Sequence, residues 1–280
     1  MTKSEETKKS PSVMPEAWGQ VVEDYESTAE KLTGMFVDPL LEAAGECEGR
    51  RVLDVATGPG VVALEAAKRG GRVTAVDFAD EMIERTSKRL REAGFEDPDC
   101  VVCDFESMEF DDGSFDIVVS NLGVMFATNP ERAFSELARV LDSGGRLAMT
   151  SWTTPKAQGF FRAVGGAMQQ ALPDLEPPGP PIWAQFSDPE VLADYLEGAG
   201  FVDPVVETVE RQWQVPSVDW FVEDIDRTSP AVTYLFETLT DDEGARFKEC
   251  LHELLTNQHG DGSFELDAEA HVARADVSET

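Results

Sequence analysis

Residues 51–62, RVLDVATGPGVV, decide the fold expected for this chain. The apolar run VLDV is broken by Gly58, Pro59 and Gly60, and apolar residues then resume at helical spacing in VVALEAAK. This pattern predicts a buried strand, a tight glycine turn and a helix whose N-terminus faces a ligand. Glycine is expected in the turn because a ligand or a second backbone passes where a Cβ would lie.

The strand–turn–helix pattern repeats along the next hundred residues. Further strands are expected at 72–78, 99–104, 115–123 and 146–152, the last after a turn at 142–145, with helical patterns between them. Strands that alternate with helices predict a Rossmann-like, doubly wound α/β sheet that is mostly parallel. Late strands near 202–215 and 269–275 lack a crossover rhythm, which favours an antiparallel edge.

These patterns divide the chain into five parts, with no internal repeats. We expect a disordered tail at 1–13, an N-terminal helical cap at 14–45, a Rossmann-like core at 46–152, a lid or acceptor-pocket segment at 153–186, and the rest of the core at 187–276 with a helical insertion at about 218–258. The Pro- and Gly-rich segment at 153–186 is the place to look for a lid.

The charge balance of the chain is strongly acidic. Its 55 acidic and 23 basic residues leave a net charge of −32, which disfavours nucleic acid and anionic membranes as partners. The acids are spread over nearly every segment and resemble the salt-adapted surfaces of halophilic archaeal proteins; an acidic surface that steers a substrate is the alternative. The polar N-terminus lacks a secretory h-region and no apolar run is long enough to span a membrane, so we expect a cytoplasmic protein without stable membrane insertion.

The four cysteines do not predict a disulfide framework or a metal site. Cys100 and Cys103 form a C-x-x-C, but the segment reads as a strand, on which residues three apart point to opposite faces. No second cysteine pair or paired histidines lie nearby in the sequence. We therefore expect no metal.

Acidic and polar residues end the predicted parallel strands: Asp54, Asp77, Asp104, and Ser120 with Asn121. Ligands bind at this edge of an open parallel sheet. The glycine turn also fits the dinucleotide pattern G-x-G-x-x-A, so an NAD-dependent oxidoreductase is one candidate. Asp54 argues against it, because a carboxylate just before the turn would repel a pyrophosphate. A cofactor with a cationic head and no phosphate suits the edge better.

Four motifs follow one another along the chain: LDVATGPG, AVDFADEM, CDFESMEFDDGSFDIVVSN and RVLDSGGRLAMTSW. In this order the chain resembles the class I S-adenosylmethionine-dependent methyltransferases, specifically the small-molecule, type 11 branch that includes the menaquinone and ubiquinone ring methyltransferases. The resemblance is strong over about 48–152 and weak over 187–276. It implies a seven-stranded sheet whose last strand is antiparallel, S-adenosyl-L-methionine as cofactor and a small-molecule methyl acceptor.

The resemblance also implies roles for particular residues. The methionine part of the cofactor would lie against Asp54 and the turn residues Ala56, Thr57, Gly58 and Gly60. Asp77 would accept hydrogen bonds from both ribose hydroxyls, Phe78 and Met82 would flank the adenine, and Asp104 with the Phe105 amide would meet the adenine amino group. Ser120 and Asn121 would border the sulfonium. Ala56 replaces the first glycine of the usual family motif. We therefore expect the chain to turn there without a positive φ.

Methyl transfer from a sulfonium is an in-line displacement that mainly requires a held acceptor and a site without water. A general base is needed only when the acceptor must lose a proton. The candidates for such a group are Tyr25 and His271, while the acceptor pocket is expected to include Trp18, Tyr25, Phe126, Phe160 and Trp183. The alternatives to a methyltransferase of a small, apolar or aromatic molecule are the NAD enzyme and a catalytically silent cofactor-binding module.

Overall fold

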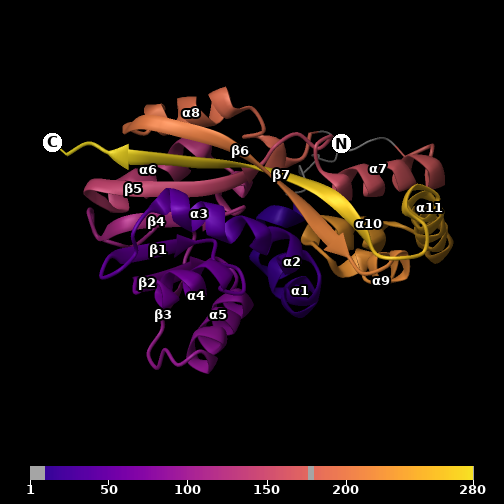
Figure 1. Ribbon diagram of the computed structural model, residues 1–280, viewed down its shortest axis with the longest axis horizontal. Coiled ribbons are helices and arrows are strands. Elements are labelled where there is room, and N and C mark those ends of the chain that lie inside the picture. The colour runs from indigo at the N-terminus through magenta and orange to yellow at the C-terminus, as the bar shows by residue number, and fades with distance from the viewer. Residues whose placement is uncertain (1–9, 176–179, 280) are drawn as a thin grey trace, which may run out of the picture.

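The computed structural model describes residues 10–175 and 180–279, and the strands among these residues form one seven-stranded sheet (Figure 1). The sheet has the order β3-β2-β1-β4-β5-β7-β6, and every neighbouring pair is parallel except the two that β7 makes. The strands are β1 (Arg51–Val55), β2 (Arg72–Asp77), β3 (Asp99–Val102), β4 (Phe115–Asn121), β5 (Leu141–Trp152), β6 (Phe201–Val215) and β7 (Phe264–Val277). The predicted Rossmann-like α/β fold with an antiparallel last strand is confirmed.

Two groups of helices cover the two faces of this sheet. Along β1, Leu53 and Val55 pack with α6 (Pro130–Val140) and α8 (Pro189–Gly198), whereas Val52 packs with α3 (Val37–Ala44) and α4 (Val61–Lys68). The strand is buried on both sides because successive side chains alternate between faces. Helix α5 (Asp80–Glu92) packs against β2 and β3.

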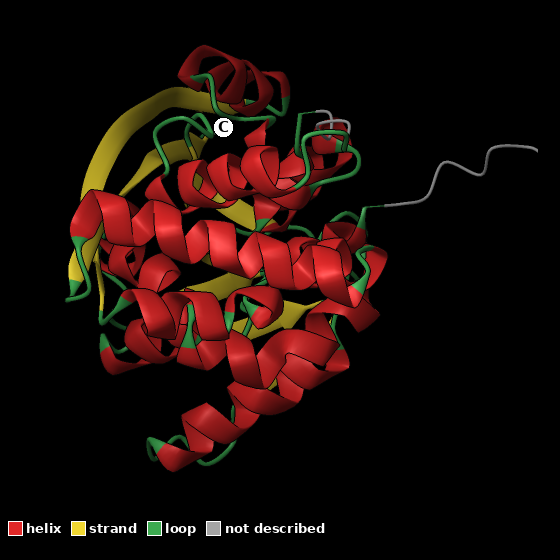
Figure 2. Cartoon of the chain, turned by 90° about the vertical axis from the view of Figure 1, so that its right-hand side faces the viewer, coloured by secondary structure: helices red, strands yellow, loops and turns green. Residues whose placement is uncertain are grey.

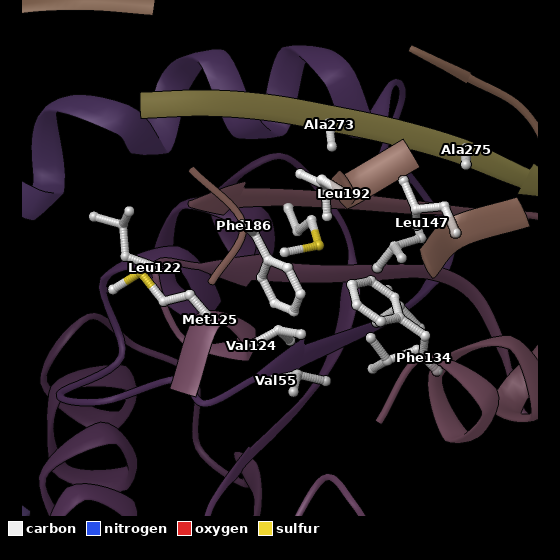
Figure 3. Packing of buried hydrophobic residues seen from close by; sticks show 14 of the residues in the cluster. Val55, Leu122, Val124, Met125, Phe134, Leu147, Phe186, Leu192, Ala273 and Ala275 are labelled. Atoms are coloured by element: carbon white, nitrogen blue, oxygen red, sulfur yellow. The ribbon is translucent and has the colours of Figure 1, made fainter. Parts of the chain in front are cut away.

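The main core lies between the sheet and the α6–α8 layer. Figure 3 shows Phe134 of α6 beside Phe186, with Leu192 of α8 and Leu147 of β5 around them. The two phenylalanine rings meet edge to face with centroids 5.5 Å apart. This packing fixes α6, and therefore the loops that leave the neighbouring strands.

The strand order reverses between β1 and β4, since β1 pairs with both β2 and β4. At such a switch point the loops diverge and leave a crevice at the carboxyl ends of the strands. The N-terminal helices α1 (Pro15–Ser27) and α2 (Ala29–Thr33) gather on this side, together with α7 (Gly159–Ala171) (Figure 1). Figure 2 views the molecule from this side and shows helices in front of the strands.

A second core lies where β6 and β7 extend beyond the rest of the sheet. Residues 264–269 of β7 pair only with β6, and their apolar side chains pack with four helices. These helices are α7, α9 (Val218–Glu223), α10 (Pro230–Thr238) and α11 (Asp241–His259). The short 3-10 helices of the chain are η1 (Pro11–Val13), η2 (Gly34–Phe36), η3 (Val124–Phe126), η4 (Ile182–Ala184) and η5 (Ile225–Arg227).

Several predicted boundaries are wrong. β3 ends at Val102 rather than Asp104, and β5 begins at Leu141, because the expected turn at 142–145 is an irregularity within the strand. Helix α7 lies in the segment expected as a lid, where its glycines hid the helical pattern. Of the tail expected at 1–13, residues 1–9 lie outside the described residues, but Pro11–Val13 is helical and Ser12 is buried.

Among the described residues, no helix is long and apolar enough to cross a membrane.

Candidate active site

A pocket opens at the carboxyl ends of β1, β2 and β4, with about 950 Å³ of empty space including its open mouth. It brings together most of the residues predicted to hold the cofactor. These are Ala56, Gly58, Asp77, Phe78, Met82, Asp104, Phe105 and Asn121. They come from the ends of strands, the loops that follow four different strands, and the start of α5, so the topology of the sheet, and not their spacing in the chain, assembles them. We call this space the cofactor pocket.

Asp77, the last residue of β2, is an acid of the cofactor pocket that two backbone amides hold in place. Its Oδ2 accepts a hydrogen bond from the Gly58 amide at 2.9 Å, and its Oδ1 accepts one from the Ala79 amide at 3.0 Å. The side chain is 5% exposed, and this burial raises the pKa of Asp77 to about 6, against the lowering effect of the amides. Each carboxylate oxygen has two lone pairs, so each can accept a further hydrogen bond from a ligand.

The glycine turn serves two purposes. Gly58 has a φ of +56° and nothing within 4 Å of the position of a Cβ, so the space above it is free for a ligand. Gly60 does not line the cofactor pocket; a Cβ there would lie 2.7 Å from Thr86 Cγ2 of α5, whose hydroxyl donates to the Gly58 carbonyl at 2.7 Å. The second glycine is therefore required by helix packing.

Two non-glycine residues adopt the left-handed conformation at the edge of the pocket. Ala56 has a φ of +53°, so the expectation that the chain turns there without a positive φ is wrong. Leu122, which follows β4, has a φ of +57°. The next residue, Gly123, leaves room for Ala56, because a Cβ on Gly123 would lie 2.4 Å from the Ala56 Cβ. Such backbone strain persists where the surrounding structure enforces it, and it often marks a functional site.

Asp54 and Thr57 lie beneath the turn, and they line a small adjoining pocket instead of the cofactor pocket. Asp54 is fully buried, and its Oδ2 accepts a hydrogen bond from the Thr57 hydroxyl at 2.6 Å. Its Oδ1 is buried without a hydrogen-bond partner in the described part of the chain. Burial raises the pKa of Asp54 to about 7, against the effect of the Thr57 hydrogen bond. A cationic group in the adjoining pocket would satisfy this oxygen.

Ser120 and Asn121, at the end of β4, differ in their placement. Ser120 is fully buried, does not line the cofactor pocket, and accepts a hydrogen bond from the Val124 amide at 3.3 Å. Asn121 lines the pocket, and its side chain joins two elements: Nδ2 donates to the Thr33 carbonyl at 3.0 Å, and Oδ1 accepts from the Thr150 hydroxyl at 2.8 Å. Asn121 thus ties the N-terminal helices to β5.

The sequence analysis missed several lining residues: Ser12, Val13, Glu106, Leu122, Gly123 and Thr128. Glu106 follows Asp104 by two residues, and Leu122 and Gly123 directly follow Asn121, so extending each predicted motif by two residues would have found them. Glu106 accepts from the Thr128 hydroxyl at 2.8 Å and the Asn129 amide at 3.1 Å, which closes the rim of the pocket. The sequence around Ser12 does not predict a place in the pocket, because only the fold of the N-terminal segment brings Ser12 there.

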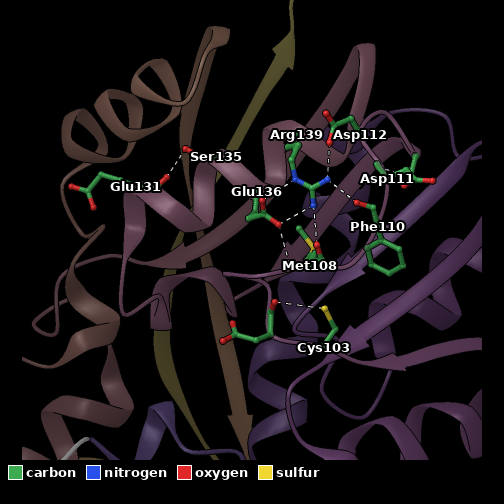
Figure 4. Close-up of polar contacts among 11 residues, drawn as sticks. Cys103, Met108, Phe110, Asp111, Asp112, Glu131, Ser135, Glu136 and Arg139 are labelled. Atoms are coloured by element: carbon green, nitrogen blue, oxygen red, sulfur yellow. Dashed lines mark hydrogen bonds and ion pairs between the residues drawn. The ribbon is translucent and has the colours of Figure 1, made fainter.

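Arg139 of α6 holds the loop that carries Asp104 and Phe105 (Figure 4). Its guanidinium donates to the carbonyls of Phe110 at 2.6 Å and Met108 at 2.9 Å, and it pairs with Asp112 at 2.8 Å. Glu136 pairs with Arg139 and also accepts from the Met108 amide at 2.9 Å. The loop after β3 is therefore fixed to α6 by charge-assisted hydrogen bonds.

A second, mostly apolar pocket adjoins the first and contains about 800 Å³ of empty space. All five residues predicted for the acceptor pocket line it: Trp18, Tyr25, Phe126, Phe160 and Trp183. Trp152, Phe161 and Trp213 extend this aromatic wall, in which the rings of Phe161 and Trp183 stack 4.3 Å apart. The two pockets share Ser12, Trp18, Tyr25, Leu122 and Phe126, so they adjoin one another there. We call this space the aromatic pocket.

Tyr25 lies at the junction of these pockets. Its hydroxyl and that of Thr33 are 3.1 Å apart and hydrogen-bonded. Burial raises the pKa of Tyr25 to about 12, and the carboxylates of Glu30 and Asp77 act in the same direction. Tyr25 is therefore placed to orient a substrate, but at neutral pH it is a protonated hydroxyl and not a base.

His271, the other candidate, lies away from both pockets. It is 4% exposed in β7, where Nδ1 is 3.1 Å from the Thr208 hydroxyl and Nε2 is 3.0 Å from the Ser187 carbonyl. Since a carbonyl can only accept, Nε2 carries the proton, and Nδ1 accepts from Thr208 when the ring is neutral. The ring anchors the segment before α8 to the sheet, and the structure does not bring His271 to either pocket.

Comparison with known proteins gives consistent matches. Residues 53–149 match the model of a methyltransferase domain family. An uncharacterised protein of Mycobacterium tuberculosis is 37% identical over 162 residues, and the match spans 57% of this chain and 57% of that protein. The demethylmenaquinone methyltransferase of Clavibacter sepedonicus is 32% identical over 170 residues, which span 57% of this chain and 68% of that enzyme.

Solved structures share the fold at lower identity. The YcgJ protein of Bacillus subtilis is 19% identical with a TM-score of 0.55, and the alignment covers 89% of this chain and 98% of that one. The phosphoethanolamine N-methyltransferase 2 of Haemonchus contortus, solved with S-adenosylhomocysteine, is 19% identical with a TM-score of 0.52, covering 86% and 52%. With the domain match and the Clavibacter relative, the fold and the pocket at its switch point show that the chain belongs to the S-adenosylmethionine-dependent methyltransferase family.

Proposed function

We propose that the cofactor pocket binds S-adenosylmethionine and that the protein transfers its methyl group to a small molecule. The observation that carries this proposal is Asp77, whose two oxygens are oriented by the Gly58 and Ala79 amides and keep lone pairs for two ribose hydroxyls. Phe78 and Met82 supply apolar surface for the adenine, and Asp104 and Phe105 lie on the loop that Arg139 holds.

The buried Asp54 supports the placement of the methionine end. Asp54 lines the small pocket beneath the glycine turn and has one carboxylate oxygen without a partner in the described part of the chain, so its carboxylate suits the ammonium group of an amino acid. A dinucleotide would place a pyrophosphate near this carboxylate, and the two anions would repel one another. The donor set therefore fits a cationic cofactor better than NAD.

When bound, S-adenosylmethionine supplies an electrophilic methyl group on a sulfonium. The protein's task is to hold the acceptor in line with the carbon–sulfur bond and to exclude water. Four of the five residues shared by the two pockets are positioned for both tasks: Trp18, Tyr25, Leu122 and Phe126. The apolar wall of the aromatic pocket favours an apolar or aromatic acceptor, and the name of the Clavibacter relative, demethylmenaquinone methyltransferase, supports such an acceptor.

Titration with S-adenosylhomocysteine tests the cofactor assignment directly. In 2 M KCl the wild-type protein is expected to bind it with a dissociation constant on the order of micromolar. Asp77→Ala is expected to weaken binding by about 1.5–3 kcal/mol for each charge-assisted hydrogen bond lost. The control is Asp267→Ala, since Asp267 pairs with Arg162 away from the cofactor pocket. Absence of binding by the wild type would refute the proposal.

Two rival functions are separated by parallel measurements. An NAD-dependent oxidoreductase would bind NADH with quenching of tryptophan fluorescence and would not bind S-adenosylhomocysteine. A catalytically silent module would bind S-adenosylhomocysteine but would methylate nothing in a broad screen of small apolar and aromatic acceptors. We further propose that the acidic surface is an adaptation to a salt-rich cytoplasm, as in halophilic archaeal proteins, because the acids are spread over the whole chain.

A further inference from the structure

Thr150 of β5 carries a buried hydroxyl that contacts the loop between the two pockets. The residue is fully buried, and it is not one of the described residues that line either pocket. Its Oγ1 accepts a hydrogen bond from the Leu122 amide at 2.9 Å and donates one to Asn121 Oδ1 at 2.8 Å. The hydroxyl therefore uses its proton and a lone pair on two consecutive residues of the loop.

The donor and acceptor roles around Thr150 are fixed, because some of its neighbours can play only one role. The Thr33 carbonyl can only accept, so Asn121 turns Nδ2 toward it, at 3.0 Å, and Oδ1 toward Thr150. The Leu122 amide can only donate, so the single hydroxyl proton of Thr150 is left for Asn121. Asn121 and Thr150 are also register partners on β4 and β5. The hydroxyl of Thr150 thus determines which way the Asn121 amide faces.

Leu122 is the residue whose backbone this hydroxyl holds directly. Its φ of +57° lies in the left-handed region, which costs free energy for any residue other than glycine. Leu122 follows β4 directly and lines both pockets. The hydrogen bond from its amide to Thr150 stabilises this conformation where the two pockets meet.

The same hydroxyl is connected to the N-terminal helices through Asn121. Asn121 donates to the carbonyl of Thr33, the last residue of α2, and the Thr33 hydroxyl is hydrogen-bonded to the Tyr25 hydroxyl at 3.1 Å. Tyr25 lines both pockets, as Leu122 does. One buried side chain is therefore connected to two residues of the junction that lie far apart in the sequence.

We infer that Thr150 is a positioning residue for the junction of the two pockets. It fixes the Leu122 backbone directly and orients the Asn121 amide. Through Asn121 and Thr33 it also holds Tyr25 in place. The inference rests on the proposed function for the ligand that the cofactor pocket receives, but the hydrogen-bonded relay exists without that ligand.

The variant Thr150→Val tests this role, since it removes the hydroxyl and keeps the shape of the side chain. Without ligand, hydrogen exchange is expected to become roughly five- to tenfold faster at the Leu122 amide and in residues 25–33, because the relay loses its hydrogen bonds. Calorimetric titration is expected to show roughly five- to tenfold weaker binding of S-adenosylhomocysteine. Thr150→Ser, which restores the hydroxyl, is expected to recover the wild-type affinity to within about twofold.

Thr153→Val is the matched control, because it removes another buried, hydrogen-bonded threonine hydroxyl. Thr153 donates to the Glu269 carbonyl at 3.3 Å and accepts from Gln158 Nε2 at 3.1 Å, and it does not line either pocket. This variant is expected to leave the exchange of residues 25–33 and the affinity for S-adenosylhomocysteine unchanged. If Thr150→Val does not fold, Thr150→Ser and Thr150→Cys give the same comparison, since both lose the methyl group and only serine keeps a strong donor.

The outcomes separate this inference from the proposed function. A wild type that binds no S-adenosylhomocysteine would refute the proposed function, and the exchange rates at Leu122 and in residues 25–33 would then decide the role of Thr150 alone. Normal wild-type binding together with an unchanged affinity of Thr150→Val would refute the positioning role and leave the cofactor standing. Unchanged exchange in residues 25–33, a loss that Thr150→Ser does not recover, or an equal loss in Thr153→Val would also overturn the inference.

Discussion

At the scale of single residues, the proposed contact of Asp77 with the cofactor predicts that cofactor binding depends on pH. Burial raises its pKa to about 6 in the free protein, and only the ionised carboxylate can accept from two hydroxyls. We expect the affinity for S-adenosylhomocysteine to be highest above pH 7 and to fall by about tenfold per pH unit below pH 6, because binding then requires loss of a proton. Calorimetry from pH 5 to 8 measures this dependence.

Asp77→Asn is the matched control for this titration, since its amide has the same shape and does not ionise. The variant is expected to bind S-adenosylhomocysteine more weakly than the wild type, and its affinity is expected not to change with pH below pH 6. An affinity of the wild type that stays constant between pH 8 and pH 5 would show that Asp77 does not receive the ligand as a carboxylate.

Asp54 makes a prediction about stability. Burial raises its pKa from 3.8 to about 7, so the stability that protonation contributes is complete below pH 3.8 and is lost as the pH rises through 7. Asp54→Asn, which stays neutral and can still accept from Thr57, is expected to unfold with a free energy roughly 2–4 kcal/mol higher than the wild type at pH 8 without ligand.

Urea unfolding at pH 8 and pH 4 measures this difference, which is expected to shrink toward zero at pH 4. S-adenosylhomocysteine is expected to bind the variant more weakly, because the carboxylate that we propose to face the ammonium group is gone. A variant that is less stable than the wild type at pH 8 would contradict the account of a costly buried charge. Stability and binding would thus oppose one another at this residue.

At the scale of elements, Arg139 shows how a helix outside the pocket positions a loop within it. Arg139→Met removes the hydrogen bonds to Met108 and Phe110 that hold the loop of Asp104 (Figure 4). We expect roughly five- to tenfold weaker binding of S-adenosylhomocysteine, with faster hydrogen exchange in residues 103–112. The control is Arg132→Met on the same helix, because the Arg132 guanidinium makes no hydrogen bond within the described residues. Unchanged exchange in 103–112 would exclude the positioning role.

The elements also show which parts of the site could be predicted from the sequence. Asp77 and Asp104 each come at the end of an apolar run, in the order expected after the glycine turn. The local sequence therefore predicts that these acids lie at one edge of the sheet. Ser12 and Thr128 enter the pocket only through packing between distant segments, which leaves no local signal. The positive φ of Ala56 depends on the space left by Gly123, which lies 67 residues later in the chain.

At the scale of the whole molecule, the aromatic pocket lies between two separately packed cores. Leu122, Met125 and Trp183 belong to the main core, whereas Phe160 and Trp213 belong to the core built on the extended β6–β7 hairpin. The cofactor pocket is made by the first core together with the N-terminal helices. The cofactor pocket thus depends on the main core, whereas the aromatic pocket depends on both cores.

The net charge of −32 makes a prediction for the whole molecule. Like charges repel more strongly in the compact state, and salt screens them over about 10 Å at 0.1 M and about 3 Å at 1 M. We expect the melting temperature to rise by roughly 5 °C or more between 0.1 M and 2 M KCl, since about 2–4 °C corresponds to each kcal/mol in a chain of this size. Sucrose of equal osmolality controls for solvent exclusion and is expected to have a smaller effect. A melting temperature that does not rise with KCl would show that the acidic surface is not a salt adaptation and would favour a role in steering a substrate.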